Sequence, residues 1–132
     1  MLVKPVDPSP LRSPQAVHTV LAQRFIGKDV VEVGTHHGDG MNCFARTARS
    51  AIAIEIDKSA CGLLRTRAQK LKQAGLGTYG VMCDFFPAHT PDADIFTWWR
   101  EAPHLSNERA LKELRERQLT GQVRAGAIAY VL

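Results

Sequence analysis

Acidic side chains stand close to glycines or turn residues in three segments of the chain, and such combinations can hold a polar ligand. In the first segment, Glu32 is followed by Gly34, Gly38 and Gly40. Glycine lets a backbone turn sharply and approach a ligand without a Cβ clash. The Glu32 carboxylate could accept hydrogen bonds from an ammonium group, or it could order the loop. An ordinary tight turn between a strand and a helix would contain the same glycines, so this segment alone does not identify a ligand.

The other two segments place carboxylates where a nucleoside could meet them. Glu55 follows Gly34 by roughly 20 positions, the spacing at which an acidic residue holds a ribose diol. The alternative is an exposed carboxylate at a strand end, and Asp57 is more simply a helix cap. Asp84 could accept a hydrogen bond from an adenine amino group while Phe85 packs on the base. A turn aspartate followed by a core aromatic residue is the alternative there.

Each of these segments follows a predicted strand. Apolar and β-branched runs alternate with stretches of helical periodicity, which is typical of an α/β fold. We expect a three-layer α/β/α sandwich around a mostly parallel sheet, whose ligands bind at the carboxyl ends of the strands. The predicted strands are 29–33, 51–56, 78–83, 93–98 and 125–132, and the predicted helices are 14–26, 41–49, 58–74 and 106–119.

Length, charge and cysteine content are those of an ordinary globular domain. The chain has 132 residues and a net charge of +4, so one domain is expected and a polyanionic partner is only weakly indicated. No apolar run reaches the ~18 residues that a membrane span needs, so no membrane partner is expected. Cys43, Cys61 and Cys83 include no CxxC pair. We therefore expect reduced thiols, no metal site and a cytoplasmic location.

The three segments, taken in order, resemble the first motifs of class I SAM-dependent methyltransferases. The resemblance covers about residues 15–132, and the ordered set is more specific than any single motif. It implies a Rossmann-like sheet with strand order 3-2-1-4-5, S-adenosyl-L-methionine (SAM) as cofactor, and methyl transfer to an unidentified small-molecule, protein or RNA acceptor. The matching residues are Glu32-x-Gly34-x-x-x-Gly38-x-Gly40, then Ala53-Ile54-Glu55-Ile56-Asp57, then Asp84-Phe85.

For the methionine part of SAM, the resemblance implies a loop formed by Glu32, Gly34 and Gly38. Thr35 and His36 would line this loop. No catalytic residue is implied, because a sulfonium methyl group is already activated and the protein mainly has to align donor and acceptor. His36 or His37 could instead serve as a general base, although a loop histidine that faces solvent or the cofactor carboxylate is the simpler interpretation.

For the adenosine part of SAM, the resemblance implies two further carboxylates and two apolar contacts. Glu55 would bind the ribose hydroxyls, and Ile56 would pack on adenine. Asp84 would meet the adenine amino group, with Phe85 against the ring. Residues 14–132 would thus form a SAM-binding Rossmann-like domain, preceded by a proline-rich N-terminal arm at residues 1–13.

Two features depart from the family pattern. Trp98 and Trp99 stand where base-directed amino-methyltransferases commonly carry an Asp/Asn-Pro-Pro-aromatic motif. They could stack on an aromatic or cationic acceptor or pack in the core. The chain also stops directly after the fifth predicted strand, whereas the family usually continues with a helix and a hairpin. An open strand edge there would favour a homo-oligomer.

Three other functions are consistent with parts of the sequence. The glycine spacing also resembles nicotinamide-dependent short-chain dehydrogenases, but their Tyr-x-x-x-Lys pair is absent, because Tyr79 is followed four positions later by Cys83. A non-catalytic SAM-binding or regulatory module would keep the same three motifs. Residues 106–124 could contact RNA, although their mixed charges favour a solvated helix.

Overall fold

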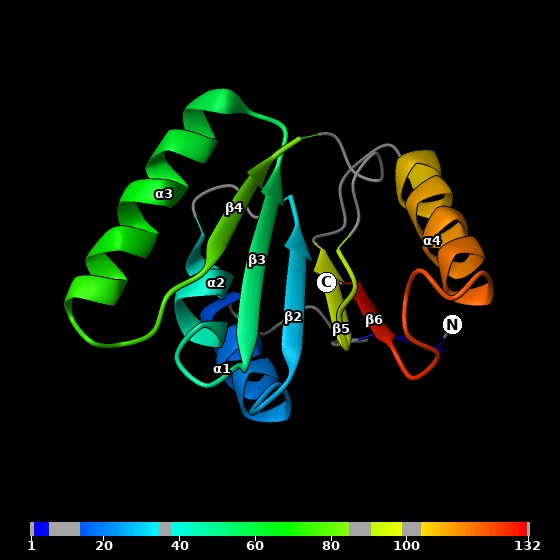
Figure 1. The fold of residues 1–132 in the computed structure, drawn as a ribbon, viewed down its shortest axis with the longest axis horizontal. Helices are drawn as coiled ribbons and strands as arrows, with labels where there is room; N and C mark the ends of the chain where they lie inside the picture. Colours follow the sequence, from blue (N-terminus) through cyan, green and yellow to red (C-terminus); the bar gives the residue numbers. More distant parts are fainter. Residues whose placement is uncertain (1, 6–13, 35–37, 85–90, 99–103, 132) are drawn as a thin grey trace.

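The computed structural model of the chain describes residues 2–5, 14–34, 38–84, 91–98 and 104–131. Its strands form one sheet in the order β1-β6-β5-β2-β3-β4, and all neighbouring pairs are parallel (Figure 1). Because β2 to β6 are the five predicted strands, the predicted order 3-2-1-4-5 is confirmed. The strands are β1 (Leu2–Pro5), β2 (Asp29–Val33), β3 (Ser50–Glu55), β4 (Gly80–Cys83), β5 (Ile95–Trp98) and β6 (Ile128–Val131).

Helices cover both faces of this sheet, as the three-layer prediction requires. Val30 of β2 packs in a core with residues of α1, α2 and α3, whereas its neighbour Val31 packs in a second core with Leu114 of α4. Figure 1 shows α3 beside β4 and α4 beside β6. None of the helices in the described part of the chain has the length and apolar composition that crossing a bilayer requires. The helices are α1 (Pro14–Arg24), α2 (Asp39–Phe44), α3 (Lys58–Gln73) and α4 (His104–Leu119).

Hydrogen bonds to groups outside the helix determine where α3 begins and where α2 ends. Asp57 caps α3 as predicted, since its Oδ1 accepts hydrogen bonds from the backbone N–H groups of Ser59 and Ala60. Helix α2 ends at Phe44, earlier than the predicted residue 49. The backbone after it pairs with the turn before β2 instead: the Gly27 N–H donates to the Thr47 carbonyl, and residue 49 donates to residue 28.

The N-terminal segment is part of the sheet. Residues Leu2–Pro5 form β1 and pair in parallel with β6, so that Leu2 lies opposite Ile128. A proline is tolerated here because β1 is an edge strand and Pro5 is its last residue. The prediction of an open edge at the fifth strand is therefore wrong, because β1 covers that edge. The edges of the sheet are β1 and β4.

The cysteines also differ from the prediction of three reduced thiols. Cys61 in α3 and Cys83 at the end of β4 form a disulfide, with their Cα atoms 5.9 Å apart. The two residues meet because α3 packs against β4, the strand that follows it in the chain. Cys43 in α2 is a free thiol.

A charge network joins the amino ends of several strands. The Arg124 guanidinium contacts carboxylate oxygens of Asp29, Asp92 and Asp94 at 3.1, 3.2 and 3.0 Å. Arg49 also binds Asp29, at 2.6 Å. Hydrogen bonds from Arg49 and Ser50 hold the pKa of Asp29 well below its ordinary value. The network therefore fixes the starting points of β2, β5 and β6 relative to one another.

We expect reduction of the Cys61–Cys83 disulfide to lower the free energy of unfolding by about 3 kcal/mol, because it closes a loop with a sequence separation of 22 residues. Urea unfolding with and without dithiothreitol measures this difference. Cys43→Ser should keep the full response to reductant, whereas Cys61→Ser should abolish it. A wild-type unfolding midpoint that ignores reductant would contradict the expectation.

We expect Arg124→Gln to destabilise the protein by about 1 kcal/mol at neutral pH, the upper range for a partly exposed ion pair. The carboxylates of Asp29, Asp92 and Asp94 have lowered pKa values in the folded protein. Their contribution is therefore present above the pKa of an unfolded aspartate and is lost as the pH falls. Thermal melts at pH 7, 4 and 2 should show that the difference between the two proteins persists down to the pKa of an unfolded aspartate, about 3.9, and narrows below it. Arg109→Gln, on the exposed face of α4, is the control and should cost little at any pH.

Candidate functional site

Three neighbouring strands bring the predicted site residues together at their carboxyl ends. Strands β2, β3 and β4 end almost level, because Val33 pairs with Ile54 and Glu55 pairs with Cys83. The Gly34 N–H extends the first pairing by donating to the Ile54 carbonyl at 2.9 Å. Their arrowheads lie together in Figure 1. Of the nine predicted residues, six lie along this edge, and Thr35, His36 and Phe85 lie outside the described residues.

The glycine loop needs glycine at Gly38 for two reasons. Gly34 and Gly38 have φ values of 67° and 81°, a region that side chains with a Cβ rarely adopt. A Cβ on Gly38 would also lie 2.6 Å from Leu64 Cδ2 and 3.0 Å from Tyr79 Oη. Gly38 therefore packs directly on α3 and on the residue that precedes β4.

Glu32 is buried beside α2 and does not reach the surface. Its side chain is completely buried, and it faces α1 and α2 from the middle of the sheet, beside Ala53 and Thr97. Gly40 of α2 comes so close that an added Cβ would lie 2.8 and 3.0 Å from the two carboxylate oxygens. The third glycine thus lets α2 approach the carboxylate.

The second predicted carboxylate is also buried. Glu55 is 4% exposed, and its Oε1 accepts a hydrogen bond from the Asp57 backbone N–H at 3.2 Å. The alternative of an exposed carboxylate at a strand end is therefore wrong. Ile56, the next residue, is 63% exposed, which is unusual for isoleucine and leaves an apolar surface at the same edge. Asp84 follows β4 and is half-buried.

Two residues that the sequence analysis did not select belong to the same region. His18 of α1 is 3% exposed, and its Nε2 lies 3.1 Å from the position of a Gly40 Cβ. Tyr79 is buried against Gly38, and burial raises the pKa of its phenol. The signal for His18 was its spacing, because positions 18, 21 and 25 share one helix face and Leu21 and Phe25 are core residues.

An ion pair fixes the start of α2 to α3. Arg67 Nη1 contacts Asp39 Oδ1 at 2.9 Å. Arg67 is only partly exposed because its side chain reaches across from α3 to α2. Together with the contact between Gly38 and Leu64, this pair determines where the glycine loop re-enters a helix.

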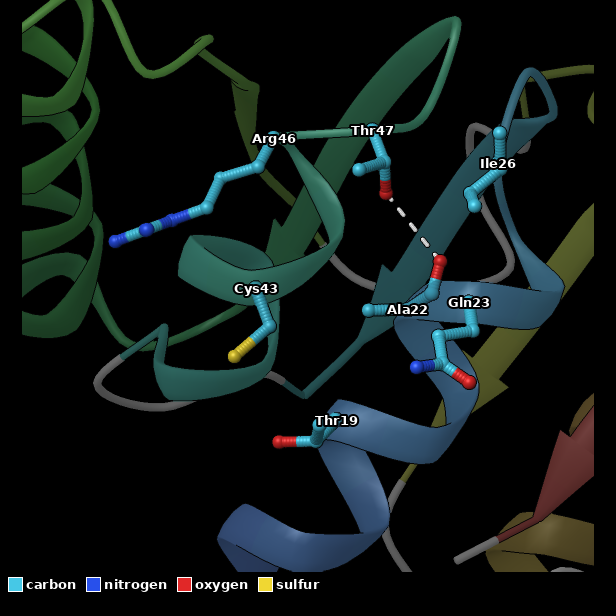
Figure 2. Close-up of a pocket in the computed structure, with 7 residues that line it drawn as sticks. All are labelled: Thr19, Ala22, Gln23, Ile26, Cys43, Arg46 and Thr47. Atoms are coloured by element: carbon cyan, nitrogen blue, oxygen red, sulfur yellow. Dashed lines mark hydrogen bonds between the residues drawn. The ribbon is translucent and has the colours of Figure 1, made fainter.

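A groove of about 280 Å³ lies between α1 and α2 (Figure 2). The Thr47 hydroxyl donates to the Ala22 carbonyl at 3.3 Å across it. None of the six predicted site residues that the structure describes lines the groove, so we do not assign the site to it. The lining residues are Thr19, Ala22, Gln23, Ile26, Cys43, Arg46 and Thr47.

Comparison with solved structures gives the fold of this chain. No family model and no curated protein sequence matches it. A precorrin-6y C5,15-methyltransferase from Geobacter metallireducens superposes with a TM-score of 0.66 at 14% identity, over 91% of this chain and 62% of that one. Magnesium protoporphyrin IX methyltransferase from Synechocystis, with bound SAH, gives a TM-score of 0.65 at 14% identity, over 77% and 50%.

A third solved structure, a dimethyladenosine transferase from Plasmodium falciparum, gives a TM-score of 0.63 at 19% identity. The match covers 80% of this chain and 38% of that one. The present chain thus corresponds to 38 to 62% of the length of these three proteins. At such low identity the likeness establishes the shared fold, and the three proteins are named for different substrates.

We expect Gly38→Ala to lower the free energy of unfolding by about 3 kcal/mol, because it adds overpacking against Leu64 and Tyr79 to an unfavourable φ. Gly121→Ala is a matched control, since Gly121 has a φ of 83° with nothing within 4 Å of an added Cβ. It should cost only about 1 kcal/mol, the backbone contribution alone. Equal losses in urea unfolding would mean that the contacts at Gly38 do not constrain the loop.

Proposed function

Because the chain has the fold of class I SAM-dependent methyltransferases, we propose that it binds SAM at the carboxyl edge of β2, β3 and β4 and transfers the methyl group to an acceptor. The observation that carries the proposal is the pair of buried carboxylates, Glu32 and Glu55, at two adjacent strands around a loop that requires glycine. A protein buries a carboxylate at a cost of several kcal/mol, so two at one edge favour a role in binding.

The side chains at this edge suit the separate parts of the cofactor. Glu32 would attract the ammonium group of the methionine part. Glu55, held by the Asp57 N–H, would accept hydrogen bonds from the ribose hydroxyls. The exposed Ile56 would cover one face of adenine, and Asp84 would accept from its amino group. Thr35, His36 and Phe85 keep the roles that the sequence resemblance implies.

Methyl transfer from SAM mainly requires the protein to align the methyl donor with the acceptor. SAM, when bound, supplies a methyl group that its sulfonium charge already activates. The residues of this chain would hold the methionine and adenosine parts on either side of the reacting centre, so that an acceptor can approach in line. The fold does not determine that acceptor, since the three compared proteins are named for different substrates.

We expect the wild-type protein to bind S-adenosylhomocysteine in calorimetry. NAD is the negative control and should give no heat of binding. Glu55→Gln should weaken binding by about tenfold or more, the loss that follows from a weakened hydrogen bond to a charged group. The glutamine can still accept from the Asp57 N–H. Glu116→Gln, an exposed change on α4, is the matched control and should bind like the wild type.

Transfer is tested separately from binding. The protein is incubated with SAM carrying a labelled methyl group and with fractionated protein, RNA and small-molecule extracts. Label in one fraction, reduced by Glu55→Gln, would support the proposal and identify the acceptor class. Binding without transfer to any fraction would instead indicate a cofactor-binding module, and absence of binding would overturn the proposal.

A further inference from the structure

Helix α3 carries an unbalanced set of charges. It contains five basic residues and no acidic residue between Lys58 and Gln73, whereas basic and acidic residues are mixed along α4. One of the five, Arg67, forms an ion pair with Asp39 of α2. The other four are exposed and have no ion-pair partner among the residues that the structure describes. These four are Lys58, Arg65, Lys70 and Lys72.

Three of these cations form a stripe along one side of the helix. Lys58, Arg65 and Lys72 follow one another at intervals of seven residues, which is nearly two helical turns. The three side chains therefore leave the helix in similar directions, about 10 Å apart along its axis. The stripe begins two residues after the exposed Ile56 and follows α3, which lies at one end of the molecule beside β4 (Figure 1).

A stripe of this length matches a chain of negative charges. Cations that are spread over about 20 Å cannot all meet one phosphate group or one carboxylate. The backbone of a nucleic acid carries a phosphate at every nucleotide, and basic side chains bind it by releasing its counterions. The net charge of +4 adds attraction over a longer range.

Other polyanions fit the stripe less well. A helix that lies on a membrane buries its apolar face among the lipids, but the apolar face of α3 is already buried in the protein core. Interfaces between proteins contain an apolar centre, whereas Gly62 and Gln69, the residues beside the stripe, offer none. Leu63, which is 44% exposed, lies on the opposite side of the helix from the stripe.

We propose that the stripe of Lys58, Arg65 and Lys72 binds the phosphate backbone of a nucleic acid. This surface is distinct from the proposed cofactor site, because none of the three residues has a role there. It also differs from residues 106–124, where the mixed charges favour a solvated helix. Contacts to phosphates carry no sequence information, so the binding should tolerate changes of base sequence.

The test measures binding to labelled RNA and DNA strands of about 20 nucleotides, each alone and paired with its complement, at several KCl concentrations. Fluorescence anisotropy gives the binding constant, whose logarithm falls linearly with the logarithm of the salt concentration. In a variant with Lys58→Gln, Arg65→Gln and Lys72→Gln, this slope should become shallower by about 2 to 3. Each lost phosphate contact accounts for about 0.7 on a single strand and about 0.9 on B-DNA.

A matched variant on α4 controls for net charge. Arg109→Gln, Lys112→Gln and Arg115→Gln together remove the same charge from exposed positions, and the slope should stay close to that of the wild type. Thermal melts show that each variant is folded. If the triple stripe variant is not, Arg65→Gln alone should make the slope shallower by about 0.7 to 0.9.

A third variant tests whether charge is sufficient. Lys58→Arg, Arg65→Lys and Lys72→Arg together keep every charge of the stripe, so the wild-type slope should be retained. The stripe variant should bind S-adenosylhomocysteine as the wild type does. The proposed function can therefore fail without affecting this inference, and the reverse also holds.

The outcomes decide the proposal. A loss of slope that is confined to the stripe variant supports it, and the strand that binds most tightly then identifies RNA or DNA as the partner. Equal losses in the stripe and α4 variants would mean that only net charge matters, and would overturn it. Absence of binding to every strand at about 50 mM salt would also overturn it. So would tighter binding to polyglutamate, or to phosphatidylserine vesicles, than to the nucleic acids.

Discussion

Strand β2 pairs in parallel with β3 on one side and with β5 on the other, and the candidate site depends on this arrangement. Parallel pairing directs the carboxyl ends of the strands to the same edge, so residues distant in sequence become neighbours there. The central position also buries Glu32 on a face covered by α1 and α2. The absence of a side chain at Gly40 allows α2 to come close to that carboxylate.

The amino ends and the carboxyl ends of the strands carry different kinds of side chains. At the amino ends, Arg49 and Arg124 are paired with three aspartates, so opposite charges lie next to each other and bind the strands together. At the carboxyl ends, Glu32 and Glu55 are buried, and the exposed apolar side chain of Ile56 lies beside them. The first arrangement satisfies its charges within the protein. The second places two buried carboxyl side chains next to exposed apolar surface.

Periodicity predicted the five strands β2 to β6, and the family resemblance implied their order. The strands themselves follow from local patterns, such as the buried run before Glu55 and the β-branched run before Gly34. Strand β1 was missed because four residues ending in proline give too little signal, and only β6 makes them a strand. The disulfide was missed because Cys61 and Cys83 meet through the packing of α3 on β4, which spacing does not reveal.

His18 was overlooked for a related reason. A single histidine on an apolar helix face forms no recognisable sequence motif. Glu32 belongs to a different element, and the two residues come near each other only in the folded chain. The helix α2 was predicted too long because the hydrogen bonds that end it come from the turn before β2. In each case a contact between distant segments overrides what the local sequence favours.

The pairing of β1 with β6 has a consequence for how the sheet is assembled. Leu2 lies opposite Ile128, so β1 pairs with a strand that is far from it in sequence. During synthesis β1 cannot pair with β6 until α4 has been made, whereas β2 and β3 can meet early. A contact of such long range closes slowly, because most of the chain entropy must be lost before it forms. The pairing of β1 with β6 is therefore expected to form after β2 and β3 have paired.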